Sequence, residues 1–244
     1  MEVPEILERL IRKFELRAVL DDGDRAAVRA LPFEKHAVDA GHYLMREGAV
    51  PQTSALLLSG FAYRHKLTAD GDRQIMSFHI PGDVIDIEGA VLRVADHNAQ
   101  TLTRAEIALV PIHRMLELFD RHPRVGRAMW VDTLIDASIY REWVMNVGRR
   151  PALQRIGHIL CEFACRLDVG GAGIIDKYQL PMTQEQLGDA AGLTPVHVNR
   201  TLRQLEASNF IVRHKRAIEI PDWHRLCAMA GFNDRYLHLD QMAA

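Results

Sequence analysis

The polar side chains of one short segment have the types and the spacing that nucleic-acid recognition requires. In the stretch LTPVHVNRTLRQLE, residues 193–206, Val198, Leu202 and Leu205 recur at helical spacing and predict a buried stripe. The polar and basic residues between them must then project from the opposite side of the helix. These outward residues are His197, Asn199, Arg200, Arg203 and Gln204.

The chemistry of these side chains matches the edges of DNA bases. The guanidinium of Arg200 has the planar fork that pairs with O6 and N7 of guanine, and Asn199 and His197 can also bond to base edges. Arg203 follows Arg200 at three-residue spacing, on the same predicted face. A polar outer face alone is typical of any solvated helix, so the neighbouring elements must decide between the two interpretations.

The flanking sequence supplies a helix start on each side of a tight turn. Thr183 has Gln186 three residues further on, which is the signature of a capping box, and Gly192 falls inside a short turn. Thr194 then precedes Pro195, a residue type that suits the first helical position. Two short β-prone runs joined by a basic turn follow in FIVRHKRAIEI. Helix, turn, helix and basic hairpin in this order predict a winged helix-turn-helix that binds DNA.

Charge is distributed unevenly along the chain, and the distribution favours DNA binding. The whole chain has a formal net charge of −2, whereas residues 194–216 hold five arginines and lysines and one acidic residue. Side chains at helix starts suit phosphate contacts that fix the register, and a basic wing adds attraction that does not depend on sequence. The predicted phosphate contacts are Thr183, Gln184 and Thr194 at helix starts and Arg213, Lys215 and Arg216 in the wing.

The N-terminal half of the chain has a different pattern. The first twenty residues predict an amphipathic helix, and short apolar runs separated by glycine-containing turns occupy residues 36–111. Residues 61–67 and 74–80 alternate in character on either side of the turn TADGD, which predicts a β-hairpin. Several such strands favour a small antiparallel β-roll, or jelly roll. With the helical C-terminal part, the predicted fold class is α+β.

Helical spacing returns at about residue 122 and continues without an internal proline to about residue 149. So long a helix on a small domain commonly has a partner along it, which predicts dimerisation, although it could also lie across its own β-roll. Trp130 and Trp143 are interpreted as packing residues of this helix rather than as ligand-stacking residues. The predicted domains are residues 1–120 (N-terminal helix and β-roll), 121–149 (long helix and hinge) and 150–244 (winged helix-turn-helix and C-terminal tail).

Three parts of the chain resemble the Crp/Fnr family of transcription regulators. The stretch from AGHYLMREG to IPGDVID resembles the family's cyclic-nucleotide-binding β-roll, the long helix follows it, and LPMTQEQLGDAAGLTPVHVNRTLRQLEASNFI resembles its helix-turn-helix. The resemblance implies a homodimer joined along the long helix, with two recognition helices in adjacent major grooves of a palindromic operator. It implies double-stranded DNA as a partner and, for an activator, RNA polymerase as well.

The β-roll departs from the members that bind cyclic AMP. In the family a glutamate that follows the glycine–aspartate turn holds the ribose, and an arginine–serine pair holds the phosphate. Ile87 stands where that glutamate would be, and Glu88 lies one position on, which in a strand would aim it at the opposite face. The phosphate pair aligns with His97 and Asn98, neither of which has a fixed cationic fork. We therefore expect any effector in this pocket to be something other than cyclic AMP bound in the known manner.

Two further departures from the family concern the iron–sulfur cluster of its oxygen-sensing members and the recognition helix. Oxygen-sensing members hold an iron–sulfur cluster with cysteines near the N-terminus, whereas no cysteine precedes Cys161 here, so that interpretation fails. The family's usual recognition-helix glutamate aligns with Val196, which could contact a thymine methyl group. Arg200 is left as the matching base contact, and the half-site sequence cannot be carried over from other members.

A different functional class remains open in the sequence. Several histidines of the predicted β-roll could hold a metal in a cupin-like site or ligate a haem, which would make the protein a metal-dependent enzyme or sensor. The clustered histidine motif and downstream glutamate of cupins are missing, so this is the second alternative, and no cofactor is expected. The histidines concerned are His42, His65, His79 and His97.

One more set of side chains has two interpretations. His158, Cys161 and Cys165 share one face of a predicted helix and could form a metal or redox switch, or could simply be buried packing residues. Packing is favoured, because no fourth ligand is evident in the sequence. The chain shows no nucleophile–base pair, glycine-rich phosphate loop or paired carboxylates, so an enzyme is not expected. Three cysteines and no signal peptide or long apolar segment predict a cytoplasmic protein.

Overall fold

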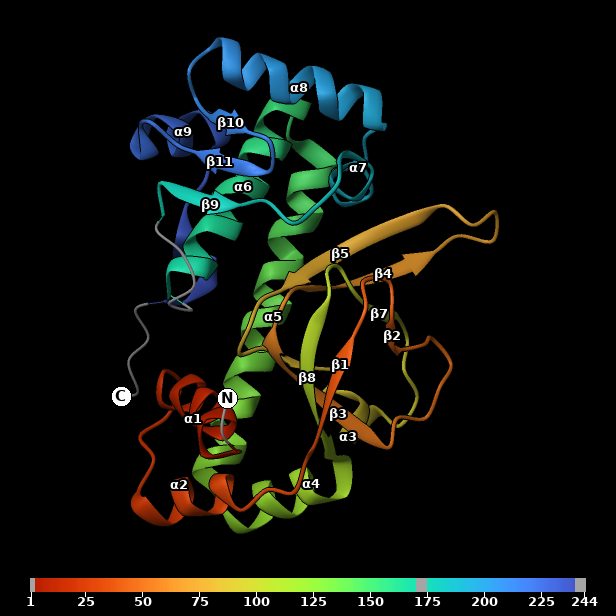
Figure 1. Ribbon diagram of the computed structural model, residues 1–244, viewed down its shortest axis with the longest axis vertical. Helices are drawn as coiled ribbons and strands as arrows, with labels where there is room; N and C mark the ends of the chain where they lie inside the picture. Colours follow the sequence, from red (N-terminus) through yellow and green to blue (C-terminus); the bar gives the residue numbers. More distant parts are fainter. Residues whose placement is uncertain (1–2, 170–174, 240–244) are drawn as a thin grey trace. The chain divides into compact units, whose positions relative to one another are not determined.

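The computed structural model describes residues 3–169 and 175–239, and the chain forms two compact units (Figure 1). The first unit takes in residues 1–64, 79–137 and 238–244, and the second takes in residues 65–78 and 138–237. A long helix, α5 (Pro123–Arg149), contributes its N-terminal half to the first unit and its C-terminal half to the second.

Two helices precede the strands of the first unit. Helix α1 (Val3–Glu15) confirms the expected amphipathic helix, and its residues Ile6 and Phe14 are buried in the core of this unit. Helix α2 (Asp22–Arg29) was not expected, because eight residues with an early glycine carry almost no periodic pattern. Its start is fixed by a capping box, in which Asp21 and Asp24 exchange side-chain to backbone hydrogen bonds.

The β-roll consists of two four-stranded sheets, in the orders β1-β8-β3-β6 and β2-β7-β4-β5. Apolar residues from both sheets, including Leu57, Ile85 and Ala99, form one buried core between them. The expected antiparallel β-roll and its hairpin, β4 followed by β5, are therefore confirmed. The strands are β1 (Glu34–Val38), β2 (Tyr43–Met45), β3 (Thr53–Ser59), β4 (Ala62–Leu67), β5 (Arg73–His79), β6 (Val84–Ile85), β7 (Asn98–Thr101) and β8 (Ala105–Pro111).

One glycine of the β-roll is required by close packing. Gly60 lies between β3 and β4 with a φ of +79°, and a Cβ atom there would lie 2.4 Å from the carbonyl oxygen of Arg104. Both facts exclude a larger residue without a backbone shift.

Two further short helices complete this unit, α3 (Gly89–Leu92) and α4 (Ile112–Arg121). Figure 1 shows α1, α2 and α4 beside the first half of α5.

Helix α5 has 27 residues and is about 40 Å long at 1.5 Å per residue. This confirms the expected long helix and both of its ends. Trp143 packs inside the second unit, where its Nε1 donates to the Glu162 carboxylate at 2.9 and 3.0 Å. Trp130, in contrast, is 66% exposed. The two tryptophans therefore have different surroundings, which helical spacing could not reveal.

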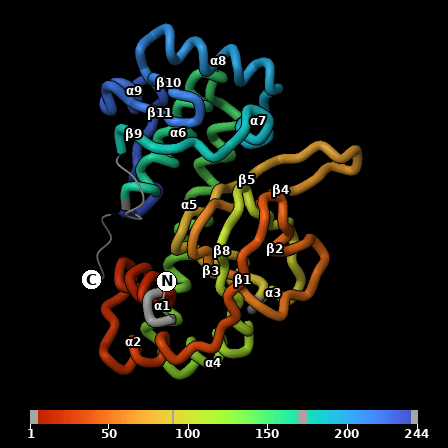
Figure 2. Tube along the Cα trace, viewed as in Figure 1, coloured from red at the N-terminus to blue at the C-terminus, as the bar shows by residue number. Residues whose placement is uncertain are grey.

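The second unit is a winged helix-turn-helix, as expected. Figure 2 shows helices α7 and α8 and a three-stranded sheet, in the order β10-β11-β9, gathered around α6. The phenol of Tyr178 on β9 donates to the carbonyl of Leu160 on α6 at 2.9 Å, which ties the sheet to that helix. The elements are α6 (Ala152–Val169), β9 (Lys177–Gln179), α7 (Gln184–Ala191), α8 (Pro195–Ala207), β10 (Val212–His214), β11 (Ala217–Glu219), α9 (Trp223–Ala230) and the 3₁₀ helix η1 (Asp234–Leu237).

The predicted division into domains at residues 120 and 149 stays a prediction.

Among the described residues, no helix combines the length with the apolar character that a membrane crossing needs.

Candidate nucleic-acid interface and effector pocket

Side-chain caps fix where both helices of the helix-turn-helix begin. The hydroxyl oxygen of Thr183 accepts a hydrogen bond from the backbone N–H of Gln186 at 3.2 Å, and the Gln186 side chain accepts one from the Thr183 N–H at 2.9 Å. The hydroxyl oxygen of Thr194 accepts from the N–H of His197 at 3.3 Å, and Pro195 occupies the first turn. The predicted capping box and cap are confirmed. Each threonine still has its own O–H to donate to a phosphate.

The turn between α7 and α8 depends on two glycines. Gly192 has a φ of +63°, in the left-handed region, and ends α7. Gly188 lies earlier in α7, and a Cβ atom on it would lie 2.4 Å from the carbonyl oxygen of Leu193. Gly192 was predicted from the sequence as a turn residue. Gly188 was not, because the reason for a glycine there is its contact with the backbone of the following turn.

Helix α8 presents a largely free outer face. Val198, Leu202 and Leu205 are almost fully buried, which confirms the expected apolar stripe. Val196 is 81% exposed at the first turn, and Arg200 is also exposed. Arg203 is exposed one turn further on, and His197 is half-buried. Two guanidinium groups and an apolar side chain therefore stand on one accessible face.

Asn199 is less free than its neighbours. Its Nδ2 donates to Oε1 of Gln184 at 3.1 Å, so the structure joins two residues that were predicted as separate DNA contacts. This bond links the first turn of α7 to α8. Asn199 therefore helps to set the angle between the helices, and it can bond to a base edge only by sharing or giving up this partner.

The wing carries fewer free cations than the sequence suggested. Arg213 on β10 is half-buried and forms a short ion pair with Glu206 of α8. The hydrogen bond from Arg213 lowers the pKa of the Glu206 carboxyl. Lys215 and Arg216 form the turn between β10 and β11, and both are exposed. These two residues are the wing cations that are placed to meet a phosphate backbone.

The chain leaves the extended conformation at the predicted effector pocket, so the condition under which Glu88 would face the opposite side of a strand is not met. Strand β6 ends at Ile85, and Asp86 then takes a φ of +63°, which breaks the alternation of side chains. Glu88 is the residue that precedes α3 rather than a strand residue. Its Oε1 lies 3.9 Å from Nε2 of His97, so these two predicted pocket residues do come together. Ile87 instead packs on the core of the N-terminal helices.

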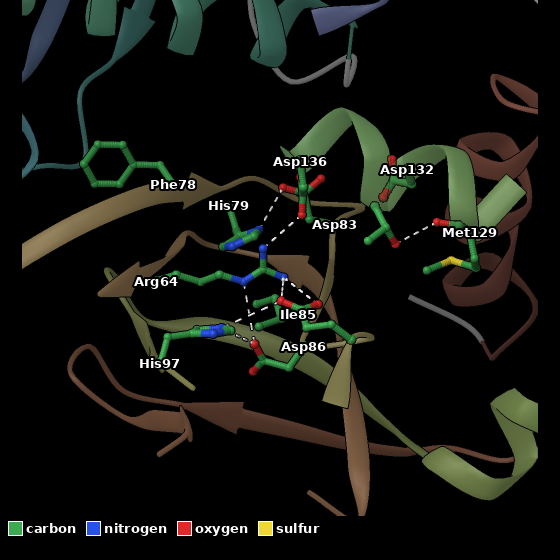
Figure 3. Close-up of polar contacts among 12 residues, drawn as sticks. Arg64, Phe78, His79, Asp83, Ile85, Asp86, His97, Met129, Asp132 and Asp136 are labelled. Atoms are coloured by element: carbon green, nitrogen blue, oxygen red, sulfur yellow. Dashed lines mark hydrogen bonds and ion pairs between the residues drawn. The ribbon is translucent and has the colours of Figure 1, made fainter. Parts of the chain in front are cut away.

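The residue that organises this pocket, Arg64, was not predicted from the sequence. Arg64 of β4 is 1% exposed, and its guanidinium lies between the carboxylates of Asp86 and Asp136 (Figure 3). Its Nη1 is 2.9 Å from Asp136 of α5, its Nη2 is 3.2 Å from Glu88, and its Nε is 3.6 Å from Asp86. An arginine in an alternating strand is expected to face solvent, so the alternation of residues 61–67 gave no indication that Arg64 is buried among carboxylates.

His97 completes the network. Its Nε2 lies 2.8 Å from Asp86 (Figure 3). Its Nδ1 lies 2.7 Å from Asp96. Burial by itself would lower the pKa of His97, but the hydrogen bonds to Asp86 and Asp96 outweigh it, and the pKa is raised. Asn98, the other residue aligned with the phosphate-binding pair, is buried, and its Oδ1 accepts from the backbone N–H of Glu47 at 3.1 Å.

The charge of Asp136 shows how strongly the network favours ionised groups. Burial would raise the pKa of this carboxyl, but Arg64 and then His79 offset burial, and the pKa is lowered. The pKa of His79 is itself lowered, first by burial and then by the positive charge of Arg64. A cation that belongs to the protein therefore stands among the carboxylates of the pocket.

These contacts weaken the metal-site alternative. Within residues 3–169 and 175–239, the set of three or more donors close enough to share one ion is Asp86, Glu88 and His97. Arg64 already pairs with both carboxylates, and the other predicted histidines, His42, His65 and His79, do not belong to the set. The second helical set is also largely internal, because His158, Cys161 and Cys165 are all buried.

Comparison with known proteins gives the same architecture. A family model for the cyclic nucleotide-binding domain matches residues 35–122, and one for the Crp-like helix-turn-helix domain matches residues 154–229. Transcriptional activator protein FnrL of Cereibacter sphaeroides is 27% identical over 239 residues, which cover 94% of this chain and 95% of the relative. Transcriptional activator protein anr of Pseudomonas aeruginosa is 23% identical over 212 residues, covering 87% and 84%.

A solved structure agrees with the fold. The structure of FixK2 from Bradyrhizobium japonicum superposes with a TM-score of 0.76 at 24% identity, covering 83% of this chain and 100% of the other. A capped helix-turn-helix with an exposed arginine face, joined to a β-roll, defines a DNA-binding transcription regulator. More narrowly, the matches to a cyclic nucleotide-binding domain and to a Crp-like helix-turn-helix domain place the chain in the Crp/Fnr family.

Proposed function

We propose that this protein regulates transcription as a homodimer that reads a palindromic operator with two copies of α8. The observation that carries the proposal is the free outer face of α8, where Val196, Arg200 and Arg203 are exposed beside the cap at Thr194. The N-terminal turn of a recognition helix is the part that reaches base edges in a major groove. Two such helices on adjacent grooves need half-sites about 34 Å apart.

The outer side of α5 supports a dimer. Trp130, Leu134 and Val144 are exposed apolar residues on this helix, and Val144 is 74% exposed. These three residues lie near one face of the helix. Leu134 is four residues after Trp130, about one turn, and Val144 is fourteen residues after it, about four turns. Exposed apolar side chains in a row along a long helix are typical of a helix–helix interface. We infer that a second copy covers this stripe.

The base-reading role falls to Val196, His197, Arg200 and Arg203, with Asn199 shared between DNA and Gln184. Thr183 and Thr194 contribute hydroxyl groups to the phosphate backbone, and Lys215 and Arg216 contribute charge. Arg213 acts mainly through its ion pair with Glu206. The relatives FnrL and anr are named transcriptional activators, which favours RNA polymerase as a further partner. Such a regulator acts in the cytoplasm, where the chromosome lies, and needs no catalytic activity.

The β-roll is proposed to work without cyclic AMP. The site that would receive the phosphate holds His97 between two carboxylates, and Arg64 binds the protein's own Asp86 and Glu88. An anionic ligand would have to displace these ion pairs or meet their negative charge. Calorimetric titration with cyclic AMP is expected to show no binding in the micromolar range. A dissociation constant in the low micromolar range or below would contradict the proposal.

Selection of bound fragments from random duplex DNA tests the main proposal. The wild-type protein should enrich an inverted repeat, and Arg200→Ala should enrich fragments without a shared base at the contacted position. A purified complex should contain two chains for each duplex in sedimentation experiments. Enrichment of no sequence at all, under low salt and with a dimeric protein, would show that the exposed face of α8 does not read DNA.

A further inference from the structure

Cys161 lies close to a second cysteine, and this proximity could not be predicted from the sequence. Cys161 lies on α6 and Cys227 lies on α9, 66 residues further along the chain, and their sulfur atoms are 4.0 Å apart. Both helices belong to the DNA-binding unit. Cys161 is buried, whereas Cys227 is only half-buried.

The packing of the two helices holds the thiols close together. Gly157 lies one turn before Cys161, and a Cβ atom on it would lie 2.9 Å from Met229 and 3.2 Å from Ala230 of α9. The two helices are therefore closely packed at a point near both cysteines. A disulfide needs a sulfur–sulfur distance of about 2.05 Å, which rotation of the two side chains and a small movement of α9 can supply.

We propose that Cys161 and Cys227 form a reversible disulfide when a hydroperoxide oxidises the protein, which joins α9 covalently to α6. This is a modification site in the DNA-binding unit that is separate from the proposed DNA contacts. It does not depend on the identity of the operator or on the β-roll.

The half-buried thiol is the one that reacts first. Hydrogen bonding with Cys161 lowers the pKa of Cys227, whereas the same contact and burial raise the pKa of Cys161. The thiolate of Cys227 attacks one oxygen of the hydroperoxide, the O–O bond breaks, and a sulfenic acid forms while the other oxygen leaves as an alcohol or water. The sulfur of Cys161 then attacks that sulfenic acid. A sulfur–sulfur bond forms, and hydroxide leaves and takes the Cys161 proton as water.

The third cysteine provides a matched control. Cys165 lies one turn beyond Cys161 on α6 and is also buried, and burial raises its pKa to about 12. Helix geometry places it further along α6 than the residue opposite Cys227. A Cys165→Ser variant should therefore keep the disulfide, whereas Cys161→Ser and Cys227→Ser should lose it.

The test treats the full-length native protein with hydrogen peroxide, blocks remaining thiols and maps peptides by mass spectrometry without reduction. Wild type and Cys165→Ser should each give one Cys161–Cys227 peptide, lose two free thiols of three and recover them with dithiothreitol. The oxidised form should melt several degrees higher, because the bond closes a long loop. If Cys161→Ser folds poorly, the test depends on Cys227→Ser, which replaces the more accessible cysteine and should abolish the disulfide by itself.

Three results would overturn the proposal. One is that the treated, folded wild-type protein keeps all three thiols. Another is that the disulfide includes Cys165 or links Cys227 of two chains, seen as a dimer on a non-reducing gel. The third is that Cys227 proceeds to a sulfinic acid while Cys161 stays a free thiol, since a partner within reach should trap the sulfenic acid first.

Discussion

At the scale of single residues, Arg200 is the residue proposed to contribute most to reading the DNA sequence. Its side chain is exposed near the start of α8, and its guanidinium fork matches the O6 and N7 atoms of guanine. We expect Arg200→Ala to remove discrimination at one base of each half-site, a loss of about 1–3 kcal/mol per contact. Competition binding between the selected operator and single-base variants measures this loss.

Lys215→Ala is the matched control for Arg200→Ala. This variant also removes one exposed cation, but from the wing turn, where contact with phosphate is expected. Binding should weaken similarly for all sequences, and the slope of log affinity against log salt should fall by about one for each subunit. If Arg200→Ala behaves like Lys215→Ala, with discrimination intact, the base-reading face has been assigned wrongly.

His97 gives a second prediction at the residue scale, and it concerns pH. Its pKa is raised in the folded protein, so the folded state binds more protons than the unfolded state above the ordinary value of about 6.5. The stability from His97 is therefore fully present below that value and is lost as pH rises through the raised folded pKa. We expect the difference in free energy of unfolding between wild type and His97→Gln to shrink as the pH rises above about 6.5.

Chemical denaturation of the two proteins across this pH range measures that difference. His79 has a lowered pKa and acts in the opposite direction, but it is present in both proteins and largely cancels in the comparison. A difference that grew with pH would mean that His97 is neutral in the folded protein and that Asp86 and Asp96 do not hold its proton.

The residue scale also shows where sequence interpretation works and where it fails. The face of α8 could be predicted, because helical spacing fixes which side chains point outward once the helix is known. Arg64 could not be predicted, because its burial depends on Asp86, Glu88 and Asp136, which come from distant parts of the chain. The Asn199–Gln184 bond was missed for the same reason.

At the scale of elements, the helix-turn-helix depends on the approach of α7 to its own turn. A methyl group on Gly188 would lie 2.4 Å from the backbone oxygen of Leu193, which no side-chain rotation can relieve. We expect Gly188→Ala to destabilise the DNA-binding unit by about 1–3 kcal/mol and to weaken operator binding, because α8 must shift. Thermal unfolding and operator titration measure the two effects.

Gly148→Ala is the matched control for Gly188→Ala. Gly148 also lies in a helix, α5, but it is exposed and a Cβ atom there would meet nothing within 4 Å. This change should leave stability unchanged or raise it by up to about 1 kcal/mol, since alanine favours the helix. Equal effects of the two substitutions would mean that the close approach at Gly188 has no structural importance.

Elements that carry a strong periodic pattern were predicted with nearly correct bounds, and α5 and the β4–β5 hairpin are examples. Short elements were not, because α2 and α3 have eight and four residues and their starts depend on local hydrogen bonds. The effector pocket depends on a local feature of the same kind. The direction of Glu88 was considered only for a strand, whereas the left-handed conformation of Asp86 ends the alternation of side chains before Glu88.

At the scale of the whole molecule, the proposed function uses two copies of the chain, and the exposed side of α5 is where they are expected to meet. Replacing Leu134 and Val144 together with glutamate would bury two unpaired charges in that interface, which costs far more than the lost apolar contact. We expect the double variant to be a folded monomer by analytical ultracentrifugation and to bind a single half-site at least about 100-fold more weakly than wild type binds the full operator.

Val91→Glu is the control for the double variant, because Val91 is also an exposed apolar residue but lies on α3 of the β-roll. This substitution should leave the protein dimeric and its operator affinity unchanged. Since each α8 alone makes few base contacts, the paired arrangement multiplies the effect of each contact, and losing it should cost more than any single base-reading residue. If the double variant remained dimeric, α5 would not be the interface, and the spacing expected between half-sites would lose its structural basis.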